Sequence, residues 1–180
     1  MPVEIHISRA GPYDATAMAA IHRTCFAKPW DAAAMAQFLA SPDVLCLMGS
    51  VADSSGGIAG GMLIARRAAD EAELLTLAVA PACRNAGLGT ALLKSAMNLL
   101  REAGAVRLFL EVEEGNEAAL RLYRSLGGEP VGRRPGYYEG RADAAIFSLA
   151  LSPPAADDGA CQQEARPSIH AQGRDERKPA

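Results

Sequence analysis

Residues 73–102 read ELLTLAVAPACRNAGLGTALLKSAMNLLRE, and this stretch decides the fold. Its first part, from Glu73 to Val79, is a short apolar run bounded by Pro81, which predicts a buried strand. From Gly87 onward the apolar residues recur at helical spacing, which predicts an amphipathic helix. The stretch is therefore expected to form a strand, a short loop and a helix. The residues expected on one face of this helix are Leu88, Ala91, Leu92, Ala96, Leu99, Leu100 and Ala103.

The loop Arg84-Asn85-Ala86-Gly87-Leu88-Gly89 opens directly onto the N-terminus of the predicted helix. The first N–H groups of a helix have no internal partner, and the helix dipole places partial positive charge there. Two glycines would let the backbone approach a bulky diphosphate. The loop lacks the Lys-Ser/Thr ending of a P-loop and does not contain GxGxxG. From the loop alone two interpretations stand equal: a diphosphate receptor, or glycines that only begin a tightly packed helix.

Composition limits the class of protein. The chain has 180 residues, is 49% hydrophobic and 22% charged, and carries a net charge of −3. These values are typical of a soluble globular protein with one domain. No basic run falls on any single predicted helix, so direct nucleic-acid binding is not expected. No signal peptide and no apolar run of membrane-spanning length is evident, so we expect no membrane association and a cytoplasmic location; the sequence indicates no oligomeric state.

Cysteine and histidine residues are scattered along the chain. The four cysteines form no CxxC pair, and the three histidines cluster neither with them nor with one another. A metal site is therefore not expected. We call the loop formed by residues 84–89 the anion loop. Cys83, just before it, is the one thiol to check for reactivity.

The remaining chain alternates strand and helix signals. Strands are expected at 3–8, 44–51, 58–66, 73–79, 107–113, 130–134 and 144–151. Residues 152–180 contain a single large apolar residue, so we expect a domain over 1–151 and a disordered tail over 152–180. Helices are expected from Pro12 to about Cys25 with Ala17, Ala20, Ile21 and Thr24 inward, from the N-cap Asp31 to Ser41, after Gly87, and from the N-cap Asn116 to Gly127.

Both the loop and the order of elements resemble a known family. The loop resembles the Arg/Gln-x-x-Gly-x-Gly/Ala loop of the GNAT acetyltransferase superfamily. The order β, α, α, β, β, β, α, β, α, β, β resembles that of a GNAT domain from Val3 to Leu151. The resemblance implies an α/β GNAT fold: a mixed, mostly antiparallel sheet flanked by helices, with its central strand splayed at the cofactor site. It also implies acetyl-coenzyme A as co-substrate, with its pyrophosphate at the loop.

Further local features are similar to one branch of that family, the bacterial enzymes that acetylate the N-terminal alanine of a small-subunit ribosomal protein. The chain departs from the pattern at Asn85, where a basic residue is usual, at Gly128, where Phe is usual, and at Gly136. The resemblance implies that the partner is a protein N-terminus. The features that carry it are Pro29-Trp30, Leu77-Ala78-Val79, Leu110-Glu111-Val112, Asn116, Leu122-Tyr123, Leu126-Gly127 and Tyr137-Tyr138.

Acetyl transfer to an amine needs a base, a proton donor and a fixed hydrogen-bond donor for the developing oxyanion. Glu111 alternates with aliphatic residues on its strand and matches the family's proton acceptor; a solvated strand glutamate is the alternative. Tyr123 matches the family's proton donor to the leaving thiolate; a core aromatic is the alternative. The oxyanion donor implied by the resemblance is the backbone N–H of Val79.

Other site residues follow from the same resemblance. Direct transfer to a protein N-terminus is the leading hypothesis, and a small-molecule amine acetyltransferase and a non-catalytic acyl-CoA-binding regulatory module remain alternatives. The residues expected at the acceptor peptide are Trp30, Tyr137 and Tyr138, with Arg133 and Arg134 left open between attracting an acidic peptide and solvating a strand end. The residues expected at the cofactor are Leu77, Ala78, Val79, Arg84, Asn85, Ala86, Gly87, Leu88, Gly89, Thr90 and Asn116.

Overall fold

A computed structural model describes residues 4–53, 56–138 and 142–151. The predicted order of strands and helices is confirmed, with two 3₁₀ turns added. None of the helices in these ranges is long and apolar enough to cross a membrane. The elements are β1 (Glu4–Arg9), η1 (Pro12–Asp14), α1 (Ala15–Arg23), α2 (Ala32–Ala40), β2 (Val44–Asp53), β3 (Gly56–Ala68), β4 (Glu71–Val79), η2 (Pro81–Cys83), α3 (Leu88–Glu102), β5 (Arg107–Glu113), α4 (Glu117–Ser125), β6 (Glu129–Tyr138) and β7 (Ala142–Ala150).

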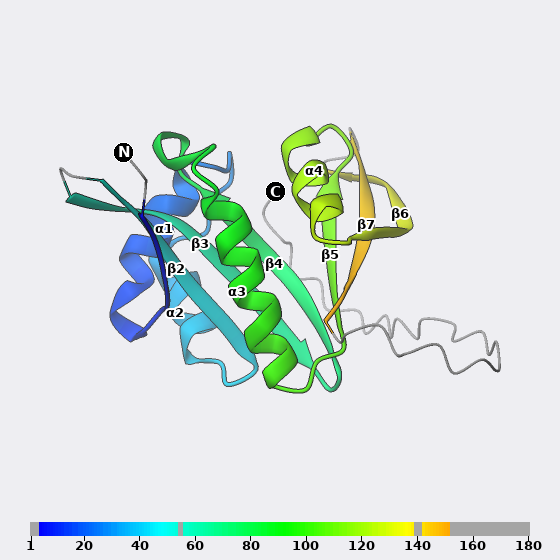
Figure 1. The fold of residues 1–180 in the computed structure, drawn as a ribbon, viewed down its shortest axis with the longest axis horizontal. Helices are drawn as coiled ribbons and strands as arrows, with labels where there is room; N and C mark the ends of the chain where they lie inside the picture. The colour runs from blue at the N-terminus through cyan, green and yellow to red at the C-terminus, as the bar shows by residue number, and fades with distance from the viewer. Residues whose placement is uncertain (1–3, 54–55, 139–141, 152–180) are drawn as a thin grey trace.

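The strands form one seven-stranded sheet in the order β1-β2-β3-β4-β5-β7-β6. All neighbouring strands are antiparallel except β4 and β5, which run parallel. In this pair only residues Glu71–Leu74 of β4 pair with β5, and their partners are Arg107–Leu110. Beyond these residues the two strands spread apart (Figure 1). We call the divergence between residues 75–79 of β4 and 111–113 of β5 the splay. The mixed, mostly antiparallel sheet with a splayed central strand confirms the predicted fold.

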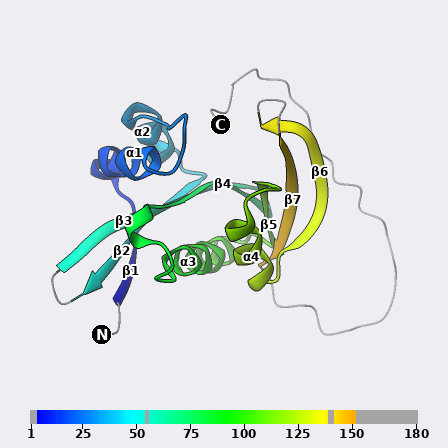
Figure 2. The same cartoon turned by 90° about the horizontal axis from the view of Figure 1, so that it is seen from above.

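Helices cover both faces of the sheet. Helix α3 packs on one face, whereas α1 and α2 pack on the other (Figure 2). Alternation along the strands supplies both cores: Leu63 of β3 packs towards α3, and the adjacent Met62 and Ile64 pack towards α1 and α2. Helix α4 lies on the same face as α3, and its Leu120 joins the larger core.

Two glycines let α3 approach the sheet closely. A Cβ atom added at Gly49 of β2 would lie 2.8 Å from Leu88 Cδ1, and one added at Gly61 of β3 would lie 2.8 Å from Leu92 Cδ1. Both leucines are fully buried. The position of the start of α3 on the sheet is therefore fixed by two leucines that pack directly on glycines of β2 and β3.

The predicted inward face of the first helix is wrong. Ala17, Ala20 and Thr24 are exposed, and of the expected set only Ile21 is buried. Met18 and His22 are buried beside Ile21, so the larger side chains, spaced three and four residues apart, and not the alanines, decide which face packs. The α-helix also begins later than predicted, at Ala15, because Pro12–Asp14 forms a 3₁₀ turn.

The close packing of α3 on Gly61 gives a stability prediction. Gly61→Val should lower the free energy of unfolding by about 1–3 kcal/mol, because its side chain overlaps leucines that cannot leave the core. Gly57→Val, on the same strand, is the control, since its Cβ would meet nothing closer than 3.8 Å. Urea unfolding followed by circular dichroism measures both, and equal midpoints for the two variants would contradict this packing.

Candidate active site

The loop before α3 presents a row of backbone N–H groups. Gly87 is the N-cap and has a left-handed φ of +84°, and Asn85 is also left-handed at +61°. Within the described residues, none of the amides from Asn85 through Thr90 donates to a protein acceptor. The first helix bond runs from the Ala91 N–H to the Gly87 carbonyl, at 3.0 Å. Consecutive unpaired N–H groups at a helix N-terminus are well suited to bind an anion.

The end of β4 presents backbone groups to the splay. The Ala80 N–H donates to the Gly60 carbonyl of β3 at 2.7 Å. In an antiparallel ladder this bond places Val79 at a non-hydrogen-bonded position, so its N–H and C=O point away from β3. Leu77 has the same orientation, whereas Ala78 bonds to β3. The outward groups of Leu77 and Val79 therefore face the side from which β5 has diverged.

Four segments meet at the end of β4. The Val79 carbonyl accepts hydrogen bonds from Arg84 Nε at 3.1 Å and from Cys25 Sγ, just beyond α1, at 3.3 Å. A Cβ atom added at Gly89 would lie 3.6 Å from Val79 Cγ2 and 3.7 Å from Leu122 Cδ2 of α4. The anion loop, the end of β4, the segment just after α1 and helix α4 therefore share one location.

Glu111 lies on β5 just past the last residue paired with β4. Leu110 and Val112 point into the core below α3, so Glu111 points to the opposite face, as predicted. Its side chain is 10% exposed, and Oε1 lies 3.1 Å from Arg134 Nη1. Its other oxygen, Oε2, is buried and has no hydrogen-bond partner within the described residues. The carboxylate is therefore held through one oxygen, whereas the other is shielded from solvent without a hydrogen bond.

Tyr123 lies on the other face. It is buried in the core below α4, with its ring centroid 6.3 Å from that of Phe147. Because the neighbours of Glu111 on β5 belong to this same core, the Glu111 and Tyr123 side chains lie on opposite faces of the sheet.

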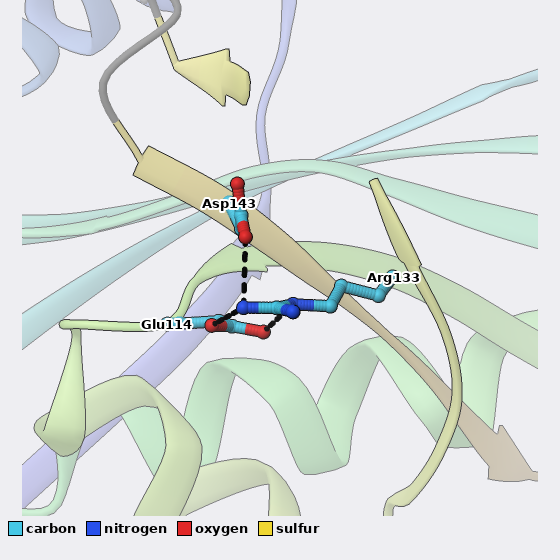
Figure 3. Close-up of polar contacts among 3 residues, drawn as sticks. All are labelled: Glu114, Arg133 and Asp143. Carbon is cyan, nitrogen blue, oxygen red and sulfur yellow. Dashed lines mark hydrogen bonds and ion pairs between the residues drawn. The ribbon is translucent and has the colours of Figure 1, made fainter. Parts of the chain in front are cut away.

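The two arginines of β6 pair with different carboxylates. Arg133 Nε and Nη2 donate to the Glu114 carboxylate at 2.6 and 2.8 Å, and Nη2 also lies 2.7 Å from Asp143 (Figure 3). The hydrogen bonds to Glu114, together with the charge of Asp143, raise the pKa of the Arg133 guanidinium. Arg134 contacts Glu111. The sequence left the role of both arginines open, and the structure pairs only Arg134 with a predicted site residue.

Trp30 belongs to an aromatic stack. Its ring lies 5.0 Å from His22 and 4.9 Å from Phe38, and His22 stacks at 4.2 Å on Phe26. The Trp30 N–H donates to His22 Nδ1 at 3.2 Å. Burial lowers the pKa of His22 to about 4, so its ring is neutral at pH 7. Trp30 is half-buried and held in a fixed orientation beside α1 and α2.

The remaining predicted residues lie at element ends. Asn116 caps α4, with Oδ1 accepting from the Ala119 N–H at 3.1 Å, as predicted. Tyr137 and Tyr138 form the last part of β6, where Tyr138 pairs with Ala142 of β7. Asn116 is exposed and leaves its side-chain amide open to a ligand.

The cysteines differ in access. Cys83, the thiol singled out from the sequence, is buried against Gly60. Burial raises the pKa of Cys46 to about 11, which keeps that thiol protonated at pH 7. Cys25, which sequence reasoning missed, is the half-buried thiol that contacts Val79. Its position four residues after the buried Ile21 was the available signal.

Comparison with known proteins identifies the family. The profile of the Acetyltransferase (GNAT) family matches residues 15–128, more than half of the chain. The chain belongs to the GNAT family of acetyltransferases. The matched range contains the anion loop, the splay and α4, so the predicted cofactor residues all fall within it.

Several curated proteins are similar to this GNAT chain. The [ribosomal protein bS18]-alanine N-acetyltransferase of Escherichia coli K12 is 43% identical over 86 residues, which are 46% of this chain and 58% of that protein. The N-alpha-acetyltransferase RimI of Mycobacterium tuberculosis is 38% identical over 110 residues, 61% of this chain and 68% of that protein. A Mycobacterium leprae protein, ML0378, is 42% identical over 61% of this chain and 30% of its own length. The chain thus spans less than two thirds of ML0378 and of the E. coli relative.

Solved structures share the fold. The crystal structure of the E. coli ribosomal-protein-S18-alanine N-acetyltransferase superimposes with a TM-score of 0.73 at 30% identity, covering 88% of this chain and 100% of that one. Arabidopsis thaliana NAA60, solved in complex with acetyl-CoA, has a TM-score of 0.70 at 20% identity, covering 82% and 98% of the two chains. The second likeness concerns the fold alone.

The left-handed glycine of the anion loop gives a binding prediction. Gly87→Ala should lower stability by about 1 kcal/mol and weaken acetyl-coenzyme A binding about tenfold, because alanine disfavours the φ that aligns the amides. Gly104→Ala is a matched control at the other end of α3, with φ +94° and an open Cβ position. It should cost the same stability and leave binding unchanged. Titration calorimetry measures both affinities, and equal affinities would contradict the role of Gly87.

The buried histidine gives a pH prediction. The unfolded chain takes up a proton at His22 near pH 6.5, whereas the folded chain does so only near pH 4, so stability is lost as the pH falls between these values. From pH 7 to pH 5 the wild-type chain should lose about 2 kcal/mol more than His22→Asn, whose Oδ1 can still accept from the Trp30 N–H. Urea unfolding at the two pH values measures the difference. Parallel losses in the two proteins would contradict it.

Proposed function

We propose that this GNAT chain transfers an acetyl group from acetyl-coenzyme A to the α-amine of a protein N-terminus. The expected acceptor is the N-terminal alanine of a small-subunit ribosomal protein, and the transfer is direct, without a covalent enzyme intermediate. The observation that carries the proposal is the Glu111 carboxylate, buried beside the splay with one oxygen unpartnered. Relatives named for this activity, at 38–43% identity, support the choice of acceptor.

The residues around the loop suit the cofactor. Acetyl-coenzyme A supplies an activated acetyl thioester when it is bound. The amides from Asn85 through Thr90 would hold its pyrophosphate, because they are unpaired and lie at the positive end of α3. The outward N–H and C=O groups of Leu77 would pair with amide groups of its pantetheine arm, like an added strand. Asn116 would add a side-chain contact.

Glu111 would act on the acceptor amine. An α-amino group with a pKa of about 7.7–8.0 is neutral for roughly a tenth of the time at pH 7. A carboxylate that accepts the remaining proton, directly or through one water, is then a sufficient base. Arg134 fixes Glu111 through Oε1, so Oε2 is the oxygen that can receive the proton.

Two further groups would complete the transfer. The Val79 N–H points away from β3 and would donate to the acyl oxygen. Tyr123 would return a proton to the departing sulfur. A Cβ atom at Gly89 would lie within 3.7 Å of both Val79 Cγ2 and Leu122 Cδ2, so α4, which carries Tyr123, lies beside the end of β4 where the acyl group would bind.

Substitution of the base tests the proposal. Glu111→Gln should lower kcat by at least about 100-fold, since it removes the proton acceptor while keeping the side-chain shape. Its affinity for acetyl-coenzyme A should stay within about twofold, because the anion loop is untouched. Glu113→Gln, two residues along the same strand and exposed, is the control and should retain full activity. Steady-state assays with a peptide acceptor and calorimetry measure the two quantities.

The choice of acceptor decides between the candidate activities. The purified chain is given acetyl-coenzyme A with a peptide beginning Ala-Arg-Tyr, with spermidine or with an aminoglycoside. The proposal expects the label on the peptide α-amine by mass spectrometry. Label found only on lysine or only on a small amine would contradict the proposal, and the second result would indicate a small-molecule acetyltransferase. Binding without any transfer would indicate a regulatory module.

A further inference from the structure

Two buried polar atoms lack a partner in the described part of the chain, and both lie beside the splay. They are Glu111 Oε2 on β5 and Thr76 Oγ1 on β4. Thr76 is 8% exposed, and the Glu111 side chain is 10% exposed. A buried acceptor or hydroxyl without a hydrogen bond costs free energy, so such atoms cluster where a ligand supplies the missing partner.

Strand register places both atoms on one face of the sheet. Thr76 pairs with Ile64, which packs towards α1 and α2, so the Thr76 side chain is on that face. Glu111 follows Leu110, which packs towards α3, so Glu111 is on the same face as Thr76. The last paired residues of the two strands are Leu74 and Leu110. Thr76 and Glu111 therefore stand just past the point where the strands part.

A β-bulge sets this arrangement. On β4, Leu74 pairs with Ala65 and Thr76 pairs with Ile64, so Leu75 is an extra residue in the ladder. The bulge restarts the alternation at Thr76 and turns its hydroxyl to the face that Glu111 occupies. Without it, position 76 would carry its side chain to the α3 core together with Leu74.

We infer that Thr76 Oγ1 and Glu111 Oε2 together form the binding site for the nitrogen of the acceptor. The inference rests on the proposed function and adds Thr76 as a residue that contacts the acceptor. An amine nitrogen carries several N–H donors, and both orphaned atoms accept hydrogen bonds. Arg134 occupies Oε1 and so leaves a single carboxylate oxygen for the acceptor. The Thr76 hydroxyl directs a second N–H, which fixes the nitrogen lone pair towards the thioester.

Removal of the hydroxyl alone is the decisive experiment. Thr76→Val keeps the shape of the side chain and should lower kcat/KM for the Ala-Arg-Tyr peptide about five- to tenfold. Affinity for acetyl-coenzyme A should be unchanged, and the melting temperature should be equal or higher, because an unpaired buried hydroxyl has been replaced by a methyl group. Thr76→Ser, which retains the hydroxyl, is the matched control and should restore most of kcat/KM.

The possible outcomes separate this inference from the function on which it rests. Unchanged kcat/KM in Thr76→Val, with Glu111→Gln inactive, would overturn the role of Thr76 and leave the proposed function standing. Weaker acetyl-coenzyme A binding in Thr76→Val would overturn it as well, since Thr76 would then serve the cofactor or the fold. Full activity of Glu111→Gln would instead remove the proposed function itself. Non-additive losses in the double variant would show that both residues act on the same nitrogen.

Discussion

The parallel pairing of β4 with β5 is the constraint on which the rest of the structure depends. It spans only four residues on each strand, after which the strands separate. Antiparallel neighbours hold β4 and β5 from their other sides, through β3 and β7, so the sheet stays intact while its centre opens. The opening leaves backbone N–H and C=O groups of β4 without a strand partner, and those groups are the ones a bound chain can use.

Several polar groups that lack a hydrogen-bond partner in the described residues lie around that opening. The loop amides, the outer edge of β4, Thr76 and Glu111 all lie around it. Each such group is costly in a folded protein, so the surrounding structure must supply the missing stability. The close packing of Leu88 and Leu92 on two strand glycines does so next to the loop, because it fixes the helix whose first amides are unpaired.

Much of the fold could be predicted from local patterns, and the exceptions have a common cause. Periodicity and caps located β5, the Asp31 cap and the Asn116 cap, because these depend on residues near one another in the chain. The buried face of α1 could not be read in this way, since it depends on which side chains the sheet accepts. Leu93 was likewise missed on α3, and Ala103, predicted inward, is exposed.

In the candidate site, too, features that depend on neighbouring residues were predicted, whereas features that depend on distant strands were not. The anion loop is contiguous, so the sequence predicted that it opens onto a helix N-terminus, whereas the left-handed φ of Gly87 was not predicted. Glu111 was found by strand alternation and by resemblance, but its pairing with Arg134 joins residues two strands apart in the sheet. Thr76 faces Glu111's side only because of the bulge at Leu75, which no local pattern in the apolar run indicates. The pairing register of distant strands therefore determines the two features that the sequence did not predict, the contact of Arg134 with Glu111 and the orientation of Thr76.

The chemistry of a carboxylate held in this way also bears on which amines it can serve. A lysine side chain, with a pKa near 10.4, is neutral for only about one part in a few thousand at pH 7, whereas an α-amine is neutral for roughly a tenth. A single carboxylate oxygen acting as the base would have little means to overcome the larger deficit. Selectivity for α-amines would then follow from proton availability before any side-chain pocket acts, and the acceptor's first residues would refine a choice already made by its pKa.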